Sequence, residues 1–217
     1  QSNAPGAPLT IAYGSQSGNG EALSKDLRKV ARNRGFGPEV CSLDDLDYGA
    51  LEDIQHLLII CSTFGEGDPP DNAKKFTAWL MSDAAPQLPN LHYSVCALGD
   101  QSYTFYCKAG IDIDRRLQEL GATPVAECAL CDVDYDDAFA TWKEAVFTHE
   151  SMIEVAKDAG GQVIEAEEVD EASGPVSWTK TNPFAATLLK VQNLNGPGSA
   201  KEVNHVEISL AGSGLEY

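Results

Sequence analysis

The fold of this chain is indicated by one stretch, Leu57-Leu58-Ile59-Ile60-Cys61, which continues directly into the loop Ser62-Thr63-Phe64-Gly65-Glu66-Gly67-Asp68-Pro69-Pro70. Five consecutive apolar residues, in contrast to an alternating pattern, predict a strand that is covered on both faces. A helical pattern follows the loop, from about Asp71 to Met81. A strand, a loop and a helix in this order predict one unit of a parallel sheet with helices on both sides.

The same order of apolar run, loop and helical pattern recurs along the first 157 residues. The expected strands lie at about residues 9–13, 40–43, 57–61, 93–98 and 125–130. The expected helices lie at about residues 21–34, 71–81, 111–120 and 136–155. These elements predict an α/β fold, a three-layer sandwich built on a five-stranded parallel sheet with right-handed crossovers.

The charge of the chain limits the functions it can have. Its 217 residues include 15 Lys and Arg and 33 Asp and Glu, which gives a formal net charge of −18. Because nucleic acids and anionic lipids are bound by basic surfaces, we expect neither nucleic acid nor membrane among the partners. The sequence has no long apolar run and no recognisable signal peptide, and its six cysteines lie mostly in strand-like stretches. These features favour a cytoplasmic protein with reduced thiols.

Composition also divides the chain. Asp158 to Glu171 contains six acidic residues and no basic one, which is typical of a solvated linker. Beyond it, two β-like stretches follow at about residues 185–191 and 202–210, and two strands do not make a stable domain. We therefore expect a tag remnant with a flexible lead, an α/β domain, an acidic linker and the truncated start of another module, at residues 1–8, 9–157, 158–181 and 182–217 respectively.

The loops at the carboxyl ends of the strands are the place to expect a ligand in such a sheet. The first of them, Gly14-Ser15-Gln16-Ser17-Gly18-Asn19-Gly20, combines hydroxyls, glycines and N–H groups at the start of a helix. This combination is typical of an anion site. The loop lacks the lysine of a nucleoside-triphosphate loop and the third glycine of a dinucleotide fingerprint. A plain turn with a helix cap remains the alternative for this loop taken alone.

The second and third loops are rich in glycine and aromatic residues. In the second loop, Ser62 to Pro70, Phe64 lies just after the strand expected at 57–61, next to Gly65. The third loop, Leu98 to Cys107, carries Tyr103, Phe105 and Tyr106. Aromatic residues on loops at a ligand-binding edge predict a flat ring held between them. Local packing is the alternative for each loop separately, but three such loops at one edge favour a ligand.

Taken together, the loops resemble the FMN-binding domain of the diflavin reductases, which has a flavodoxin-like fold. The resemblance covers about residues 9–150. Three motifs carry it and come in the family's order: Ser15-Gln16-Ser17-Gly18-Asn19, the second loop Ser62-Thr63-Phe64-Gly65-Glu66-Gly67-Asp68-Pro69-Pro70, and Leu98-Gly99-Asp100-Gln101-Ser102-Tyr103. Asp132-Val133-Asp134-Tyr135 is similar to the family's fourth, acidic loop. Within the family, the pattern Gly-Asp-x-Ser-Tyr-x-Phe-x-Cys of the third loop is most similar to the sulfite-reductase branch. The tail from Asn182 to Leu215 resembles the opening of the family's FAD- and NADPH-binding module.

The resemblance implies a role for each loop. The first would hold the FMN phosphate through hydroxyl and N–H groups. The isoalloxazine ring would lie between Tyr103 and the second loop, where Phe64 takes the place of a stacking tyrosine found in the microsomal reductases. The carbonyl of Gly65 would accept a hydrogen bond from N5–H of the one-electron-reduced ring. Asp100 and the residues up to Cys107 would support the ring and ribityl chain, and Asp132 would lie near the ring edge. The implied FMN site comprises Ser15, Gln16, Ser17, Gly18, Asn19, Gly20, Ser62, Thr63, Phe64, Gly65, Leu98, Gly99, Asp100, Gln101, Ser102, Tyr103, Thr104, Phe105, Tyr106, Cys107 and Asp132.

The resemblance also implies an electron relay. Electrons would pass from NADPH through FAD to this FMN, and then to a metal-centred acceptor such as the haemoprotein subunit of sulfite reductase. The acidic residues around the flavin would disfavour an anionic reduced ring and attract a basic docking face. The chain alone is not expected to oxidise NADPH, because most of the FAD and NADPH module would be missing.

Two alternatives stay open at this point: a different acceptor, such as a haem-thiolate monooxygenase or a nitrate reductase, and a flavin-free acidic interaction module. The Cys128-Ala129-Leu130-Cys131 motif has neither a second pair nor a nearby histidine, so it is interpreted as two ordinary thiols and not as a metal site. No catalytic acid, base or nucleophile is expected.

Overall fold

The computed structural model describes residues 6–159, 187–194 and 203–209. The chain divides into two compact units, Gln1–Glu165 and Ala166–Tyr217, and each is described by itself. Of the expected lead, residues 6–8 are described, and Ala7 and Pro8 already belong to the first strand. The expected linker lies outside the described residues from 160 onward.

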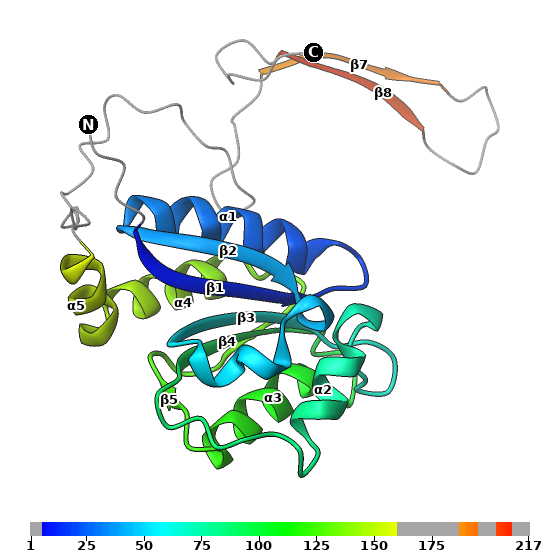
Figure 1. The fold of residues 1–217 in the computed structure, drawn as a ribbon. Coiled ribbons are helices and arrows are strands. Elements are labelled where there is room, and N and C mark those ends of the chain that lie inside the picture. The colour runs from blue at the N-terminus through cyan, green and yellow to red at the C-terminus, as the bar shows by residue number, and fades with distance from the viewer. Residues whose placement is uncertain (1–5, 160–186, 195–202, 210–217) are drawn as a thin grey trace. The chain divides into compact units, whose positions relative to one another are not determined.

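The first unit is built on a parallel sheet, in which the strands stand in the order β2-β1-β3-β4-β5 (Figure 1). The short strand β6 also pairs with β4, farther along β4 than β5 does. The strands are β1 Ala7–Gly14, β2 Phe36–Ser42, β3 His56–Ser62, β4 His92–Leu98, β5 Thr123–Pro124 and β6 Ala129–Cys131. Since β5 and β6 occupy successive parts of one position in the sheet, the expected five-stranded parallel sheet is confirmed.

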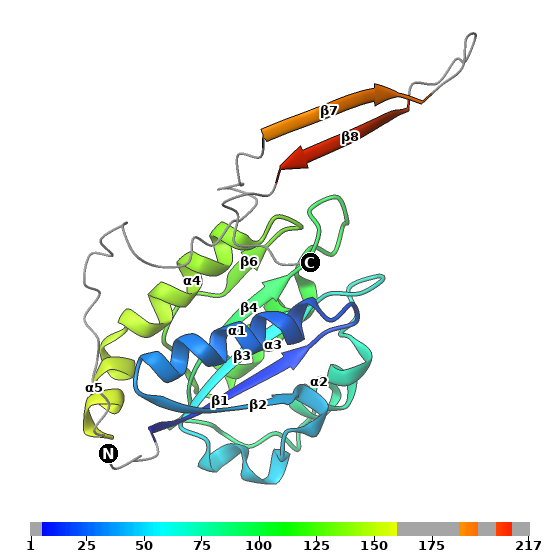
Figure 2. The same ribbon diagram turned by 90° about the horizontal axis from the view of Figure 1, so that it is seen from above.

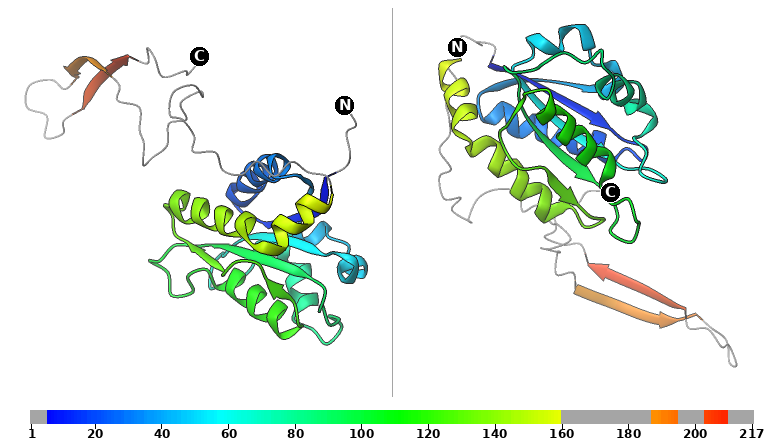
Figure 3. Two further views of the ribbon diagram at one scale, coloured as in Figure 1. Left: turned by 90° about the vertical axis from the view of Figure 1, so that its left-hand side faces the viewer. Right: turned by 90° about the horizontal axis from the view of Figure 1, so that it is seen from below.

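Helices cover both faces of the sheet (Figures 2 and 3). The helices are α1 Asn19–Asn33, α2 Lys74–Leu80, α3 Lys108–Glu119, α4 Asp136–Thr148 and α5 Glu150–Asp158, with short 3-10 turns η1 Leu43–Asp45, η2 Tyr48–Asp53 and η3 Asp71–Ala73. Buried side chains of α1, α4 and α5 form one core, and those of α2, α3, η1 and η2 form the other. The first unit is therefore the three-layer sandwich that the sequence predicts.

Strand β3 shows why a continuous apolar run is needed here. Leu58 and Ile60 point into the core under α1 and α4, whereas Leu57, Ile59 and Cys61 point into the core under α2 and α3. All five side chains are at most 1% exposed. A strand with a core on each side leaves no position for a polar residue, as the pattern indicated.

The strand order also fixes where a ligand can bind. The chain turns to opposite sides of the sheet after β1 and β3, which lie next to each other at its centre. The loops that follow them therefore separate and open a crevice at the carboxyl ends of the strands.

The clearest differences from the expectation concern three elements. Strand β2 begins at Phe36, four residues earlier than the expected start at 40, because the chain already pairs with β1 there. The strand expected at 125–130 is interrupted: residues 125–128 leave the ladder between β5 and β6. The helix expected at 136–155 breaks at His149, which has extended backbone angles and whose Nδ1 accepts a hydrogen bond from the N–H of Ser151 at 3.3 Å.

At the amino ends of the strands, opposite the crevice, two histidines stack. His56 begins β3 and His92 begins β4, and their ring centroids are 5.5 Å apart at an angle of 19°. His56 is 4% exposed. Within the described part of the chain, the Nδ1 atoms of both rings are buried without a hydrogen-bond partner.

The described part of the second unit is one antiparallel pair, β7 Thr187–Asn193 and β8 Asn204–Ser209. The pairing places Val191 opposite Val206, and Lys190 opposite Glu207. Apolar residues therefore gather on one face of the hairpin and charged residues on the other. The two stretches expected to be β-like do form strands, with bounds shifted by about two residues.

Among the described residues, no helix is both long enough and apolar enough to cross a membrane.

Candidate cofactor site

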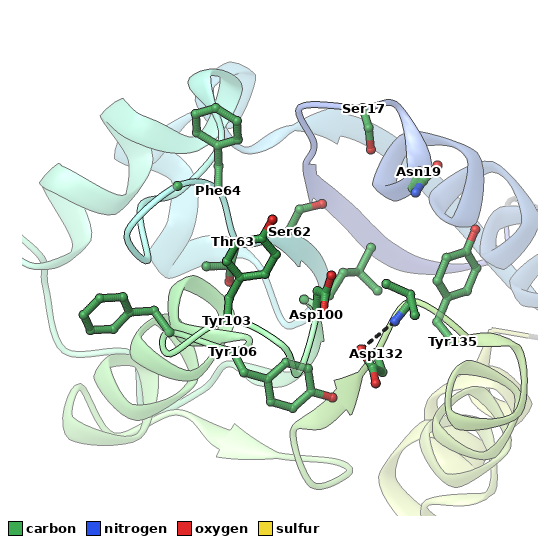
Figure 4. Close-up of a pocket in the computed structure, with 15 residues that line it drawn as sticks. Ser17, Asn19, Ser62, Thr63, Phe64, Asp100, Tyr103, Tyr106, Asp132 and Tyr135 are labelled. Carbon is green, nitrogen blue, oxygen red and sulfur yellow. Dashed lines mark hydrogen bonds between the residues drawn. The ribbon is translucent and has the colours of Figure 1, made fainter.

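Four loops meet at the carboxyl ends of the strands and enclose a cavity of about 570 Å³ (Figure 4). This volume lies in the range of roughly 300–1,000 Å³ that is usual for small-molecule and cofactor sites. The cavity is lined by Ser17, Asn19, Ser62, Thr63, Phe64, Gly65, Leu98, Gly99, Asp100, Tyr103, Phe105, Tyr106, Asp132, Val133 and Tyr135.

The loop between β1 and α1 is organised around one hydroxyl. Ser15 Oγ accepts hydrogen bonds from the N–H groups of Gly18 and Gly20, at 3.0 and 3.1 Å. Gly18 has a positive φ of 88°, which favours glycine at this helix start. In the described part of the chain, the N–H groups of Ser17 and Asn19 donate to no protein acceptor. Two free N–H groups at the start of a fifteen-residue helix suit an anion.

The loop after β3 is closed on itself. Phe64 N–H donates to the carbonyl of Asp68, and Asp68 N–H donates to the carbonyl of Phe64, both at 2.8 Å. Gly65 and Gly67 have φ values of 53° and 98°, which this tight loop requires. The Phe64 ring is 54% exposed and points outward, away from Asp100 and Asp132 (Figure 4). The loop therefore offers its backbone and Thr63 to the cavity more than it offers an aromatic face.

The loop after β4 starts with a glycine that the packing demands. A Cβ atom on Gly99 would lie 2.7 Å from the backbone nitrogen of Cys107 and 2.9 Å from Cδ2 of Tyr106. Asp100 Oδ1 then accepts from the N–H of Ser102 at 2.8 Å and from its hydroxyl at 2.6 Å. These two bonds hold the pKa of the Asp100 carboxyl below its usual value. The carboxylate thus shapes the turn that presents Tyr103.

Tyr103 and Tyr106 supply aromatic surface to the cavity from this third loop (Figure 4). Tyr103 is 65% exposed, an unusual state for a large aromatic side chain. Burial raises the pKa of the Tyr106 hydroxyl to about 12, so that it stays protonated at neutral pH. An exposed ring beside a cavity is available to stack on a flat ligand.

The fourth loop, which follows β6, is tied to the third by one carboxylate. Asp132 Oδ1 accepts from the N–H of Gln101 at 3.0 Å and from the N–H of Val133 at 2.8 Å. Asp132 therefore fixes the spacing of two walls of the cavity, in addition to placing a negative charge there.

Cys107 is the last residue of the third loop. It is fully buried, and it has a positive φ of 55°, the only such value among the non-glycine residues described. Its Sγ donates to the carbonyl of Ala97 at 3.2 Å. Burial raises the pKa of its thiol to about 11, so it is protonated at neutral pH. The thiol anchors the loop to β4 and does not face the cavity.

The predicted site residues thus fall into two groups. Those on the cavity wall have been given above. The others do not line the cavity: Ser15, Gln16, Gly18, Gly20, Gln101, Ser102, Thr104 and Cys107. Val133 and Tyr135 also line the cavity, although the sequence analysis did not include them in the site. Their position directly after Asp132, in a motif already noted, was the signal that could have found them.

In the motif from Cys128 to Cys131, the sulfur contact of Cys131 is with a cysteine outside the motif. Cys131 Sγ lies 3.5 Å from Sγ of Cys96 on the neighbouring strand β4, and both thiols are fully buried. Its contact is thus with a residue 35 positions away in sequence, and Cys128 is not part of this contact. All six cysteines are free thiols.

The electrostatic character of the cavity is negative. Its lining contains Asp100 and Asp132 and no Lys or Arg. An anion bound there would be held by backbone N–H groups and hydroxyls at α1, well within the part of the cavity that Ser17 and Asn19 form (Figure 4).

The chain belongs to the flavodoxin family, whose members bind FMN and transfer electrons: the flavodoxin family profile matches residues 11–142. A solved flavodoxin from Streptococcus pneumonia TIGR4 superposes with a TM-score of 0.58 at 25% identity, over 64% of this chain and 95% of that one. A short-chain flavodoxin associated with a PDU bacterial microcompartment gives a TM-score of 0.60 at 18% identity, over 68% of this chain and 99% of that one, and supports the fold.

Within this class, the chain is similar to one part of a larger protein. The chain is 43% identical over 96% of its length to the sulfite reductase [NADPH] flavoprotein alpha-component of Bacillus subtilis (strain 168). It is 42% identical over 98% of its length to the protein of the same name from Vibrio vulnificus. The chain spans about a third of the length of these relatives, 34% of each.

Proposed function

We propose that the cavity between the four loops binds FMN through the residues named above. The observation that carries this proposal is the geometry of the site: free N–H groups at the start of α1 lie on one side of a cavity of about 570 Å³, and exposed Tyr103 lies on another. The phosphate would be held by Ser17, Asn19 and the loop that Ser15 organises. The isoalloxazine ring would lie between Tyr103 and the backbone of the loop after β3.

The fit of FMN to these residues depends on close packing of the loops as well as on the hydrogen-bond donors at the start of α1. Gly99 leaves space where any Cβ would displace Cys107 and Tyr106. Gly65, with its positive φ, can change its carbonyl orientation at low cost and so present an acceptor to the ring edge. Bound FMN would supply one- and two-electron redox chemistry, for which the protein contributes binding, orientation and electrostatics.

The acidic surroundings would set the electron-transfer behaviour of the site. Asp100 and Asp132 oppose the accumulation of negative charge in the cavity, because like charges at short distance repel in a partly dry site. Further acids lie on these loops or in the first turn of the helices that follow them: Glu66, Asp68, Asp71, Asp134, Asp136 and Asp137. Such a surface would guide a partner with a basic docking face.

At the level of the whole protein, we propose that this domain works in a sulfite reductase flavoprotein. An FAD- and NADPH-binding module of the same parent chain would deliver electrons, and a haemoprotein subunit would accept them. The identity to relatives of that name over nearly the whole chain supports this assignment. Residues 158–181 would act as the tether that lets the domain visit donor and acceptor, and the cytoplasm would be its compartment.

The first test is a visible absorption spectrum of the purified chain, with FMN added if the protein is colourless. We expect the bands of an oxidised flavin, a stoichiometry of one FMN per chain, and bleaching under stepwise anaerobic reduction. A protein that neither carries nor takes up FMN would contradict the proposal and favour a flavin-free interaction module.

The acceptor is tested by mixing the photoreduced domain with candidate haemoproteins. We expect rapid reoxidation by the haemoprotein subunit of sulfite reductase, slowed by salt because the docking is electrostatic. Equal or faster reoxidation by a haem-thiolate monooxygenase would argue for a different partner.

Asp132 allows the charge of the site to be separated from its architecture. Asp132→Asn keeps an oxygen for the N–H groups of Gln101 and Val133, so FMN affinity should change little, whereas the midpoint potential should rise by on the order of 20–50 mV as a negative charge is lost. Asp132→Ala removes the acceptor too, so FMN affinity should fall roughly tenfold.

Fluorescence titration and a redox titration measure the two effects of the Asp132 substitutions. Asp53→Asn, an exposed position in η2 at the opposite end of the sheet, is the matched control and should change neither value. Equal loss of affinity in Asp132→Asn and Asp132→Ala would show that the charge, and not the pair of hydrogen bonds, determines binding.

A further inference from the structure

Two walls of the cavity are joined behind it by the short turn η3. The N–H of Ser15, in the first loop, donates to Oδ1 of Asn72 at 2.9 Å. The N–H of Asp71 donates to Oε1 of Gln16 at 3.3 Å, and Gln16 Nε2 is 3.5 Å from Oδ2 of Asp71. These contacts bridge more than fifty residues of sequence, since η3 follows the second loop directly.

A close approach of backbones makes the junction possible. A Cβ atom on Gly14 would lie 2.8 Å from Cβ of Ala73 and 3.0 Å from Sγ of Cys61. Because position 14 has no side chain, η3 packs directly against the end of β1. Asn72 is thereby brought within reach of the first residue of the loop.

Ser15 is the residue through which this junction acts. Its N–H is bound by Asn72, and its hydroxyl accepts from the N–H groups of Gly18 and Gly20. Fixing the Ser15 backbone therefore fixes the oxygen about which the loop folds. The loop in turn leaves the N–H groups of Ser17 and Asn19, two residues of the cavity wall, without a protein acceptor in the described part of the chain.

The charge beside the junction is balanced. Asp71 is close to the first loop, where an uncompensated carboxylate would repel an anion. Lys74 Nζ lies 2.6 Å from Asp71 Oδ1, and the pKa of Asp71 is lowered first by this hydrogen bond and then by that of Gln16. Asn72 itself supplies an oxygen acceptor without a charge. An aspartate there would hold Ser15 equally well but would add a negative charge to the anion site.

We propose that Asn72 is a positioning residue that determines the preference of the site for a phosphorylated over an unphosphorylated flavin. It acts through Ser15, by holding the loop in the shape that binds phosphate before the ligand arrives. The proposal rests on the proposed function, because it assumes that the cavity binds FMN. Asn72 is not among the residues that line the cavity, so its effect should reach the site only through Ser15 and the phosphate end.

The test compares FMN with riboflavin, which carries the same ring and ribityl chain without the phosphate. Dissociation constants for both are measured by flavin fluorescence quenching on the apoprotein of the full chain. In Asn72→Ala, FMN affinity is expected to fall about tenfold, the factor that one lost preorganising hydrogen bond gives. Riboflavin affinity should stay within about twofold of wild type, since the ring site is untouched.

Two further variants keep the result interpretable. Asp47→Ala removes the same kind of contact, an Oδ1 that accepts from the N–H of Gly49 at 3.0 Å, in an exposed turn that does not line the cavity. It should leave both affinities unchanged. If Asn72→Ala does not fold, Gln16→Ala removes the second tie from an exposed side chain and should lower FMN affinity, with a smaller factor and with the same selectivity.

The outcomes separate the two proposals. Absence of FMN binding in the wild type would overturn the proposed function. Wild-type FMN binding with equal losses for FMN and riboflavin in Asn72→Ala, or with no loss for either, would overturn the role of Asn72. A selective loss for FMN supports both.

Discussion

A single methyl group added at Gly99 is expected to weaken FMN binding by roughly one to two orders of magnitude. The new Cβ of Gly99→Ala would lie 2.7 Å from the backbone nitrogen of Cys107 and 3.0 Å from its Sγ. The backbone of Cys107 cannot rotate away as a long side chain can, so the third loop must shift. Overpacking of this kind costs about 1–3 kcal/mol. The shift displaces Tyr103 and Tyr106, which the proposed site needs for the ring.

The loss at Gly99 should appear both in binding and in stability, because the clash is with the fully buried Cys107. Titration with FMN, together with thermal unfolding of the apoprotein, measures both. Gly49→Ala is the matched control, since a Cβ there meets only Oδ1 of Asp47 at 3.3 Å. Undiminished affinity in Gly99→Ala would show that the third loop does not pack against the ring as proposed.

The second large effect concerns acid stability and arises at the opposite end of the sheet. Burial, followed by the neighbouring His92 ring, lowers the pKa of His56 to about 4. In the unfolded chain the group titrates near its ordinary value of about 6.5. Between these two values the unfolded state binds more protons than the folded state, so stability falls as the pH is lowered from 6.5 to 4.

We expect this one residue to remove about 2–3 kcal/mol of the free energy of unfolding over that interval, after a discount for solvent screening. His56→Leu should flatten this part of the profile, whatever its effect on stability at neutral pH. Urea unfolding between pH 7 and pH 4 provides the measurement. His205→Gln, in the other unit, should preserve the slope, and an unchanged slope in His56→Leu would assign the acid sensitivity to other groups.

The sequence was most informative where burial alone decides structure. Strands β3 and β4 fall within one residue of their expected bounds, because an unbroken apolar run can only be covered on both faces. Strand β2 was underestimated, because Gly37 and Pro38 are poor strand formers, and only pairing with β1 makes that segment extended. The break between α4 and α5 at His149 could not be predicted, because no glycine or proline lies beside that residue.

The same distinction applies to the site. The loops could be located from the sequence, since their place follows from the strand order and their residues carry a specific pattern. The tie between Ser15 and Asn72 could not, because 57 positions separate the two residues and an asparagine at a helix start is usually a local cap. Likewise, the contact between Cys131 and Cys96 depends on strand register, which spacing along one segment does not reveal.

The interrupted fifth strand has a consequence for how copies of this protein behave at high concentration. An outermost strand offers unpaired N–H and C=O groups to any other chain that arrives in extended form, and this is a common start of aggregation. On one side of the sheet, β5 and β6 are two and three residues long, so no continuous row of such groups exists. On the other side, β2 carries Pro38, which has no N–H to donate. Both margins of the sheet are thus poor templates, and the domain should remain dispersed while the loops around its cavity stay uncovered.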